Sequence, residues 1–381
     1  DDPELKPRGE VVETKSFNRF LPLTMERSPL IDPTVWEGLE QVGFRLGEET
    51  IHLAKVRVLS DIPYPVAVGA GVHLPSFAEV YDLLLPCPVE SGLVLGVILG
   101  TEDMQETLPE ELKSLAPLYK KGEGILHQRG VPFVFDHCAM QEYPHIGIFG
   151  GSGSGKSFGM RVILEELLEK QIPTLVFDPH YEMSFATPFE GMDGDMAKKY
   201  LGRTEILTVA RDTGVNFEDL TSNDLASLLT AAGGNFTEGM DNALKTIHQG
   251  KDSFVSFAKK LDDCIGLAEK EEETLTGIRK NYGERSAYEK KIVNLARQAG
   301  HPSSLRGIRW RLHRLNREGI FQKDISPITS ALNRRRLTVI RGPIWLLTVF
   351  SAYLIRKLYG MRRSYQDAIQ RGDSPGDKFP P

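Results

Sequence analysis

A glycine-rich segment at residues 150–157 carries the residue types of a phosphate-binding loop. It reads GGSGSGKS and matches the pattern G-x-x-x-x-G-K-[ST] in full. Glycines let the backbone curl so that successive N–H groups point inward at phosphates. The Lys156 ammonium can reach the β- and γ-phosphates, and the Ser157 hydroxyl can bind Mg²⁺. The pattern predicts a site for ATP and Mg²⁺, with nucleotide contacts from Gly151, Ser152, Gly153, Ser154, Gly155, Lys156, Ser157 and Phe158.

Two carboxylates follow the next apolar run of the chain. Residues 173–178 read PTLVFD, and Asp178 opens the segment DPHYE that ends in Glu182. Parallel-sheet enzymes bind ligands where strands end, so one carboxylate can hold Mg²⁺ through water while the other positions the attacking water. We therefore predict Lys156, Asp178 and Glu182 as catalytic residues, and Ser157 and Asp178 as metal ligands. The alternative is that Asp178 caps the next turn and Glu182 is solvated.

The elements around these residues indicate an α/β fold. Residues 144–149 have the pattern of a strand, residues 158–170 have apolar side chains at helical spacing, and residues 173–178 read as a second strand. This order predicts a parallel sheet with helices on both faces, with further strands at 205–209 and 336–340. The charged stretch at 220–325 reads as a helical insertion. We expect a P-loop ATPase domain over 131–381.

Before this domain, residues 1–130 contain short apolar runs punctuated by Gly and Pro, which predict a small β-barrel or sandwich. Residues 108–119 read as a connecting helix. The apolar stretch at 344–355 is too short to span a bilayer and reads as a buried helix, so we expect no membrane association. Three scattered cysteines with no metal or disulfide spacing favour a cytoplasmic protein.

Charge is distributed unevenly along the chain. The whole chain has a net charge of -6, whereas residues 301–381 hold 16 Lys and Arg against 5 Asp and Glu. Such a basic block suits a polyanion, and a solvated helix face or an oligomer contact explains it equally well. Within it, the arginines between 306 and 317 recur at near-helical spacing, and Trp310 is expected in the core. Residues 334–336 are three arginines that we place at a sheet edge or a subunit interface.

The loop and the DPHYE segment together resemble the HerA-type ATPases of the HerA/FtsK superfamily, and residues 142–157 are similar to its bacterial members. The segments LRGIRWRL at 305–312 and TVIRGP at 338–343 are similar as well. The N-terminal β-rich region is similar to the HAS barrel of that family. The resemblance implies a homo-hexameric ring of RecA-like domains, a helicase-type motor that translocates double-stranded DNA. It also implies a partner, either a nuclease of the NurA type acting in DNA repair or an effector of antiviral defence.

The sequence departs from this family in one respect. The family has a second apolar strand ending in Asp-Glu, the Walker B site, which follows a helix like the one expected at 350–371. Here residues 376–381 read GDKFPP. We expect truncation or disorder just before that strand, which would leave the catalytic glutamate and the arginine finger beyond Pro381.

A short protein that binds ATP and hydrolyses it poorly is the alternative. It motivates a second hypothesis, a nucleotide-gated scaffold for a partner effector. A DNA-transfer ATPase of the secretion-coupling type is a third.

Overall fold

The computed structural model describes residues 7–18, 41–43, 50–59, 61–62, 65–120, 123–140, 142–185, 194–268 and 286–373. The chain divides into two compact units, Asp1–Leu74 and Pro75–Pro381. The predicted domain boundary near residue 130 lies within the second unit. Residues 376–381, where the sequence departs from the family pattern, lie outside the described residues.

The first unit contains an antiparallel pair of strands, β1 (Gly9–Asn18) and β2 (Thr50–Val58). Their register places Gly9 opposite Val58 and Asn18 opposite Thr50, with an irregularity between Val11 and Glu13. Closure into a barrel is not seen among the described strands, so the barrel stays a prediction.

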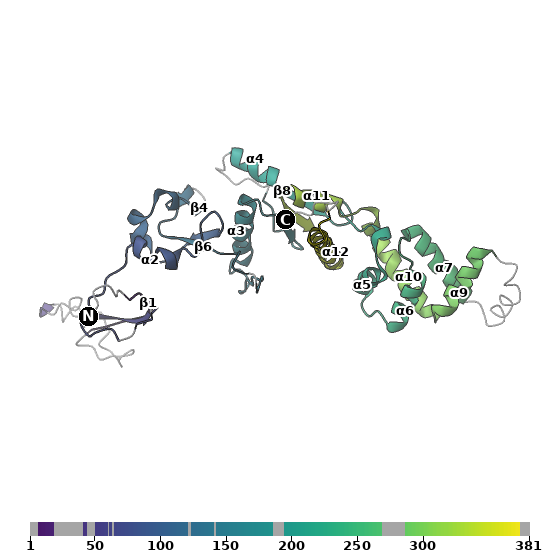
Figure 1. Ribbon diagram of the computed structural model, residues 1–381, viewed down its shortest axis with the longest axis horizontal. Helices are drawn as coiled ribbons and strands as arrows, with labels where there is room; N and C mark the ends of the chain where they lie inside the picture. Colours follow the sequence, from purple (N-terminus) through teal and green to yellow (C-terminus); the bar gives the residue numbers. More distant parts are fainter. Residues whose placement is uncertain are drawn as a thin grey trace. The chain divides into compact units, whose positions relative to one another are not determined.

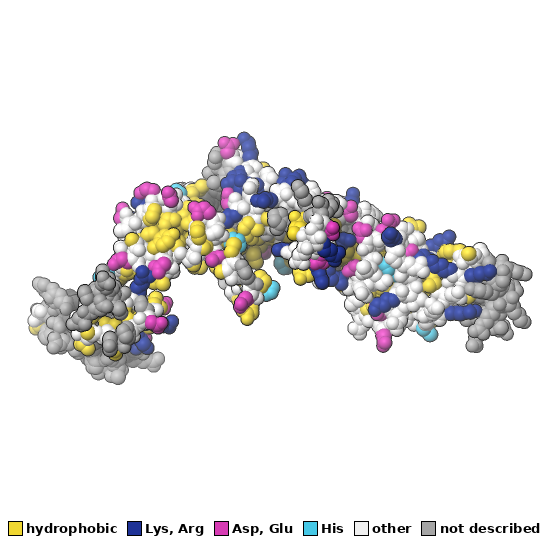
Figure 2. All heavy atoms as spheres, in the orientation of Figure 1, with side chains coloured by type: hydrophobic (Ala, Val, Ile, Leu, Met, Phe, Trp, Pro, Cys, Tyr) yellow, Lys and Arg dark blue, Asp and Glu magenta, His cyan; other side chains and the backbone are white. Residues whose placement is uncertain are grey.

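The second unit begins with α2 (Phe77–Leu84) and two antiparallel strand pairs. One pair joins β3 (Leu93–Val97) to β6 (Pro132–Phe135), and the other joins β4 (Pro117–Lys120) to β5 (Gly124–His127). A small core, including Phe77, Val94 and Val131, joins α2 to the β3–β6 pair. Apolar side chains also reach the surface around α2 and β6 (Figure 2), for example Tyr81 and Phe133.

The helix predicted at 108–119 is wrong. Short 3-10 helices occupy Glu102–Thr107 and Glu110–Leu112, and β4 begins at Pro117. Pro109 and Pro117 cannot donate backbone hydrogen bonds, and each constrains the residue before it away from helical geometry. Leu108 is instead buried in the small core, and Leu112 and Leu115 pack against it.

The second unit contains a three-stranded parallel sheet in the order β7-β9-β8, of which β8 is labelled in Figure 1. The strands are β7 (Thr174–Phe177), β8 (Thr204–Thr208) and β9 (Leu337–Arg341). Thr174 and Thr204 both lie opposite Leu337, so the three strands start in register. The parallel sheet is confirmed, and so are three of its four predicted strands, those at 173–178, 205–209 and 336–340.

Both faces of this sheet are covered, as continuous apolar runs require. Leu337 and Val339 of β9 pack on one face against α3 (Lys156–Glu169), whose Leu164 and Leu168 are buried there. The short helix α4 (Gly194–Arg203) covers the same face near β8. Ile340 points to the opposite face, which is covered by α11 (Ser326–Asn333) and α12 (Ile344–Gln370).

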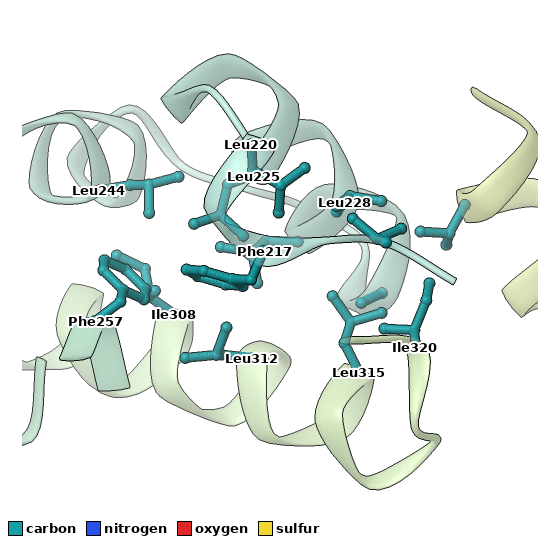
Figure 3. Packing of buried hydrophobic residues seen from close by; sticks show 14 of the residues in the cluster. Phe217, Leu220, Leu225, Leu228, Leu244, Phe257, Ile308, Leu312, Leu315 and Ile320 are labelled. Atoms are coloured by element: carbon teal, nitrogen blue, oxygen red, sulfur yellow. The ribbon is translucent and has the colours of Figure 1, made fainter. Parts of the chain in front are cut away.

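Between β8 and β9 the chain forms a group of helices that we call the helical lobe. It consists of α5 (Ser222–Gly233), α6 (Glu238–Ile247), α7 (Phe254–Ala268), α9 (Ala287–Gln298) and α10 (Pro302–Arg317). Figure 3 shows Ile308, Leu312 and Leu315 of α10 pointing toward Phe217 and the side chains of α5. This core continues beneath α12, so the lobe and the sheet are joined by one apolar cluster.

Candidate functional site

The segment that precedes the glycine-rich loop is not a strand. Residues 142–150 have no regular secondary structure, and Ile146 and Phe149 are 51% and 93% exposed. The prediction of a strand at 144–149 is therefore wrong for this structure. A buried parallel strand exists only where neighbouring strands complete its hydrogen bonds. None of the described strands pairs with this segment, so it forms no part of a sheet.

The glycine-rich loop itself turns tightly into α3. Gly153 and Gly155 have φ angles of +77° and +87°, a conformation that residues with a Cβ rarely adopt. Lys156 Nζ donates a hydrogen bond to the carbonyl oxygen of Gly151 at 2.6 Å, which holds the side chain back across the loop. The ammonium group thus lies against the loop where the pattern predicts phosphate binding. Phe158 is 72% exposed, at the outer side of the first helical turn.

The start of α3 is open to an anionic ligand. The first turn of any helix has N–H groups without intrahelical acceptors, and these are commonly satisfied by a capping side chain. The N-cap residue of α3 is Gly155, which has no side chain to do this, and the first turn contains no acidic residue. These N–H groups and the helix dipole suit a phosphate group, so the loop fits the predicted nucleotide.

Asp178 lies at the end of β7 and organises the turn after it. Its side chain is buried, and it accepts hydrogen bonds from the backbone N–H groups of Glu182 and Met183, both at 3.0 Å. It also forms an ion pair with Arg341, whose Nε lies 3.1 Å from Asp178 Oδ2. Tyr181, in the middle of this turn, has a φ of +60°. Asp178 thus acts here as the anchor of the turn.

Glu182 is the carboxylate that reaches the loop. Ser157 Oγ donates to Glu182 Oε2 at 2.7 Å, which joins the first turn of α3 to the turn after β7. Arg161 of α3 donates to the backbone carbonyl of Glu182 and fixes the turn from the same side. Of the three predicted catalytic residues, Lys156 and Glu182 are exposed to a ligand at the loop, and Asp178 lies behind Glu182.

These oxygen atoms fit Mg²⁺, which binds few protein ligands and shares the rest with water and substrate phosphates. Ser157 and Glu182 would supply the protein oxygens. Within the described part of the chain, no three His, Cys, Asp or Glu side chains gather as a metal cluster. A metal at this place would therefore depend on phosphate oxygens for most of its coordination.

Arg341 is the residue of this site that the sequence analysis did not single out. It ends β9, beside β7 in the sheet. Besides the ion pair with Asp178, its Nη2 donates to the carbonyl oxygen of Met183 at 2.9 Å, and its guanidinium lies 5.4 Å from the Tyr181 ring centre. The signal was present in the sequence, since an arginine at the end of a predicted parallel strand lies at the ligand-binding edge.

The basic residues have several separate roles. Arg311 is buried and donates to the carbonyl oxygens of Gly233 and Asn235, and Arg314 donates to that of Ala232, so both cap the end of α5. Arg336 pairs with Glu205 of β8, within the sheet. The prediction that Trp310 lies in the core is wrong, because this side chain is 55% exposed. The apolar face of α10 is completed by residues 305, 308, 312 and 315, which turns position 310 outward.

A parallel sheet, a glycine-rich loop with Lys and Ser, and a helix that begins at that loop define a P-loop nucleotide-binding protein. The family model described as "Helicase HerA, central domain" matches residues 125–342, more than half of the chain. The chain therefore belongs to the HerA family, which indicates an ATPase of the P-loop class. No curated protein matches the chain. Among the described helices, none combines the length and apolarity needed to cross a bilayer.

Proposed function

We propose that this chain is the ATPase subunit of a homo-hexameric ring that translocates double-stranded DNA. The observation that supports this is the contact between Ser157 and Glu182, which brings together the helix start and the turn after β7 in a member of the HerA family. The contact places a carboxylate beside the residues that would bind the phosphates and Mg²⁺. The ring's partner would be a nuclease of the NurA type or a defence effector.

Each residue of the site has a role in this proposal. Lys156 neutralises charge on the transferred phosphate, and backbone N–H groups of residues 151–158 hold the remaining phosphate oxygens. Ser157 binds Mg²⁺, which stabilises negative charge on the phosphates when it is bound. Glu182 orients the attacking water. Asp178, predicted as a metal ligand, contributes by holding Glu182 in place and can reach the metal only through water.

A second function has support from the same region. Asp178 follows the end of β7, β8 ends at Thr208 and β9 ends at Arg341, so the described strands of the sheet supply no Asp-Glu pair at the ligand-binding edge. A nucleotide-gated scaffold with little ATP turnover would need only the loop. In that case the nucleotide would order residues 150–157 and the turn at 178–183, and a partner effector would recognise the result.

ATP hydrolysis by the purified protein, with and without duplex DNA, tests both functions. The motor predicts duplex-stimulated hydrolysis that is lost in Lys156→Ala and strongly reduced in Glu182→Gln, with Lys198→Ala on the exposed surface of α4 as the matched control. Removing the charged donor should weaken nucleotide binding by roughly 1.5–3 kcal/mol. Binding without turnover would favour the scaffold. Hydrolysis that survives Lys156→Ala would reject the site itself.

A further inference from the structure

The outer face of α10 presents a row of cationic and aromatic side chains. Arg306, Trp310, His313 and Arg317 are exposed and recur at intervals of three and four residues, so they lie on one side of the helix. The opposite side carries the buried Leu305, Ile308, Leu312 and Leu315. The two faces are distinct, and the outer one is not needed for the core of the lobe.

This face is hollowed. A groove of about 660 Å³ runs along α10, lined by four arginines together with Trp310, His313 and Glu318. Arg317 lies eleven positions after Arg306, which corresponds to about 16 Å along the helix axis. The lining contains a single carboxylate, and Asp262 lies 3.5 Å from Arg309 at the border of the groove. The groove is therefore strongly cationic over a length that several consecutive phosphates can occupy.

The position of Trp310 is fixed by the neighbouring helix end. A Cβ atom added at Gly233 would lie 2.7 Å from Cζ3 of the Trp310 ring and 2.6 Å from Arg311 Nε, so the ring packs directly on the backbone at the end of α5. Arg311 and Arg314 lie 5.7 and 5.8 Å from the ring centre and hold the same helix end by hydrogen bonds. Trp310 is packed against Gly233 along one edge and lies beside two guanidinium groups, and it is still 55% exposed, so part of the ring is open to a ligand.

Figure 2 shows Lys and Arg side chains scattered over much of the helical lobe, so positive charge alone does not distinguish α10. What distinguishes α10 is the combination of these charges with the exposed ring of Trp310. Aromatic side chains within a cationic groove bind single-stranded nucleic acids, since unpaired bases stack on the rings while the phosphates contact the cations. A duplex keeps its base faces inside the stack, and an acidic peptide would use the arginines without needing the indole surface.

We infer that the outer face of α10 is a binding site for single-stranded nucleic acid, with phosphates on Arg306, Arg309 and Arg317 and a base stacked on Trp310. This site lies on the helical lobe and uses none of the residues of the glycine-rich loop. It is separate from the proposed translocation of duplex DNA. A strand separated from its complement would be held here.

The test is fluorescence anisotropy of a labelled oligodeoxythymidine and of a labelled duplex, with full-length protein, EDTA and no nucleotide. Nucleotide is omitted so that only this site is measured. As a further control, Lys156→Ala should bind the oligonucleotide as the wild type does, because the loop takes no part. We expect Trp310→Ala to weaken binding of the single strand roughly tenfold and to leave duplex binding unchanged. Trp310→Phe, which keeps a ring, should retain most of the affinity.

Arg317→Ala provides a second variant whose side chain is exposed and outside the core. It should lower the slope of log affinity against log salt by about 0.7 for the single strand, the value for one phosphate contact. Arg363→Ala, an exposed arginine of α12, is the matched control and should change nothing. The inference is overturned if folded Trp310→Ala and Arg317→Ala bind the single strand normally. It is also overturned if poly-glutamate displaces the strand more effectively than unlabelled oligodeoxythymidine does.

Discussion

Two helices of the helical lobe and the helix that follows the glycine-rich loop, α3, differ in how their first turns are capped. In the lobe, α5 and α9 begin with complete capping boxes, at Thr221 with Asp224 and at Ser286 with Glu289. The helix after the loop begins at Gly155 with no capping side chain. A capped helix has its first N–H groups satisfied within the chain, whereas an uncapped one has them available for a ligand. The lobe is complete as it stands, and the loop is completed by what it binds.

The two regions also differ in how far their aromatic side chains are buried. Three aromatic rings pack around Phe217 with ring centres within 5.2–5.8 Å: Phe254 and Phe321 edge to face, and Phe257 tilted at 34°. At the loop, Phe149 and Phe158 are 93% and 72% exposed. This difference indicates that the lobe contributes mainly to stability and the loop mainly to ligand binding. Substitutions should therefore affect one property with little effect on the other.

The largest expected effect is on stability, from Phe257→Ala in α7. This ring is fully buried and lies 5.6 Å from Phe217 and 5.4 Å from His248, so its removal leaves a cavity in the lobe. We expect a loss of about 3–5 kcal/mol in the free energy of unfolding, measured by urea denaturation. Val255→Ala, a 73% exposed position of the same helix, is the control and should change it by less than about 0.5 kcal/mol. Equal effects of the two substitutions would contradict the comparison.

The sequence predicts the sheet better than it predicts the loop's surroundings. The runs at β7, β8 and β9 are apolar on both faces, and such runs are typical of central parallel strands. The same kind of run at 144–149 forms no strand, because pairing depends on neighbours that a local pattern cannot reveal. Trp310 was misplaced for a related reason, since its exposure is decided by how α10 rotates onto α5.

Within the site, the glycine-rich loop could be predicted from residue types because the glycines determine the backbone path. The role of Asp178 could not be predicted from residue types. A carboxylate at a strand end can bind a metal or anchor a turn, and the deciding partner, Arg341, is 163 residues away in the sequence. Long-range pairs of this kind are settled by the register of β7 against β9. Only the described structure brings Arg341 and Asp178 together.

We expect Arg341→Met to have a smaller effect, and to lower both stability and ATP hydrolysis. The substitution leaves the buried Asp178 carboxylate without its cation and releases the turn that carries Glu182. We expect a loss of about 2 kcal/mol in unfolding free energy, since a buried charged acceptor loses its donor. ATP hydrolysis should fall as well. Arg334→Met, which removes a more exposed pair with Glu205, is the control and should cost less than about 1 kcal/mol.

Adding Asp178→Asn to Arg341→Met separates anchoring from charge. Removing the unpaired charge should restore part of the stability, while hydrolysis stays low because the turn is still released. The coupling is measured as the difference between the double variant and the sum of the single ones. Full recovery of hydrolysis in the double variant would mean that Arg341 does not position Glu182.

The smallest expected effect is the pH dependence contributed by His248. Burial against Phe217 and Phe257 lowers the pKa of His248 below its usual value, because the charged imidazolium is poorly solvated there. Unfolding returns the pKa to about 6.5. The unfolded chain therefore binds a proton that the folded protein does not, in the window between the two pKa values. Stability from this group is complete above that window and is lost as the pH falls through it.

His248→Asn removes the titrating group and keeps an amide near Ser222, whose Oγ lies 3.0 Å from His248 Nδ1. Carboxylates elsewhere also titrate in acid, so the quantity to measure is the difference in unfolding free energy between wild type and variant across pH. From neutral pH downward, the wild type should lose stability faster than the variant, by at most about 1.4 kcal/mol per pH unit. Parallel curves would show that His248 is solvated. In that case the lobe would be less completely closed than its aromatic core implies, and the contrast with the loop would be weaker.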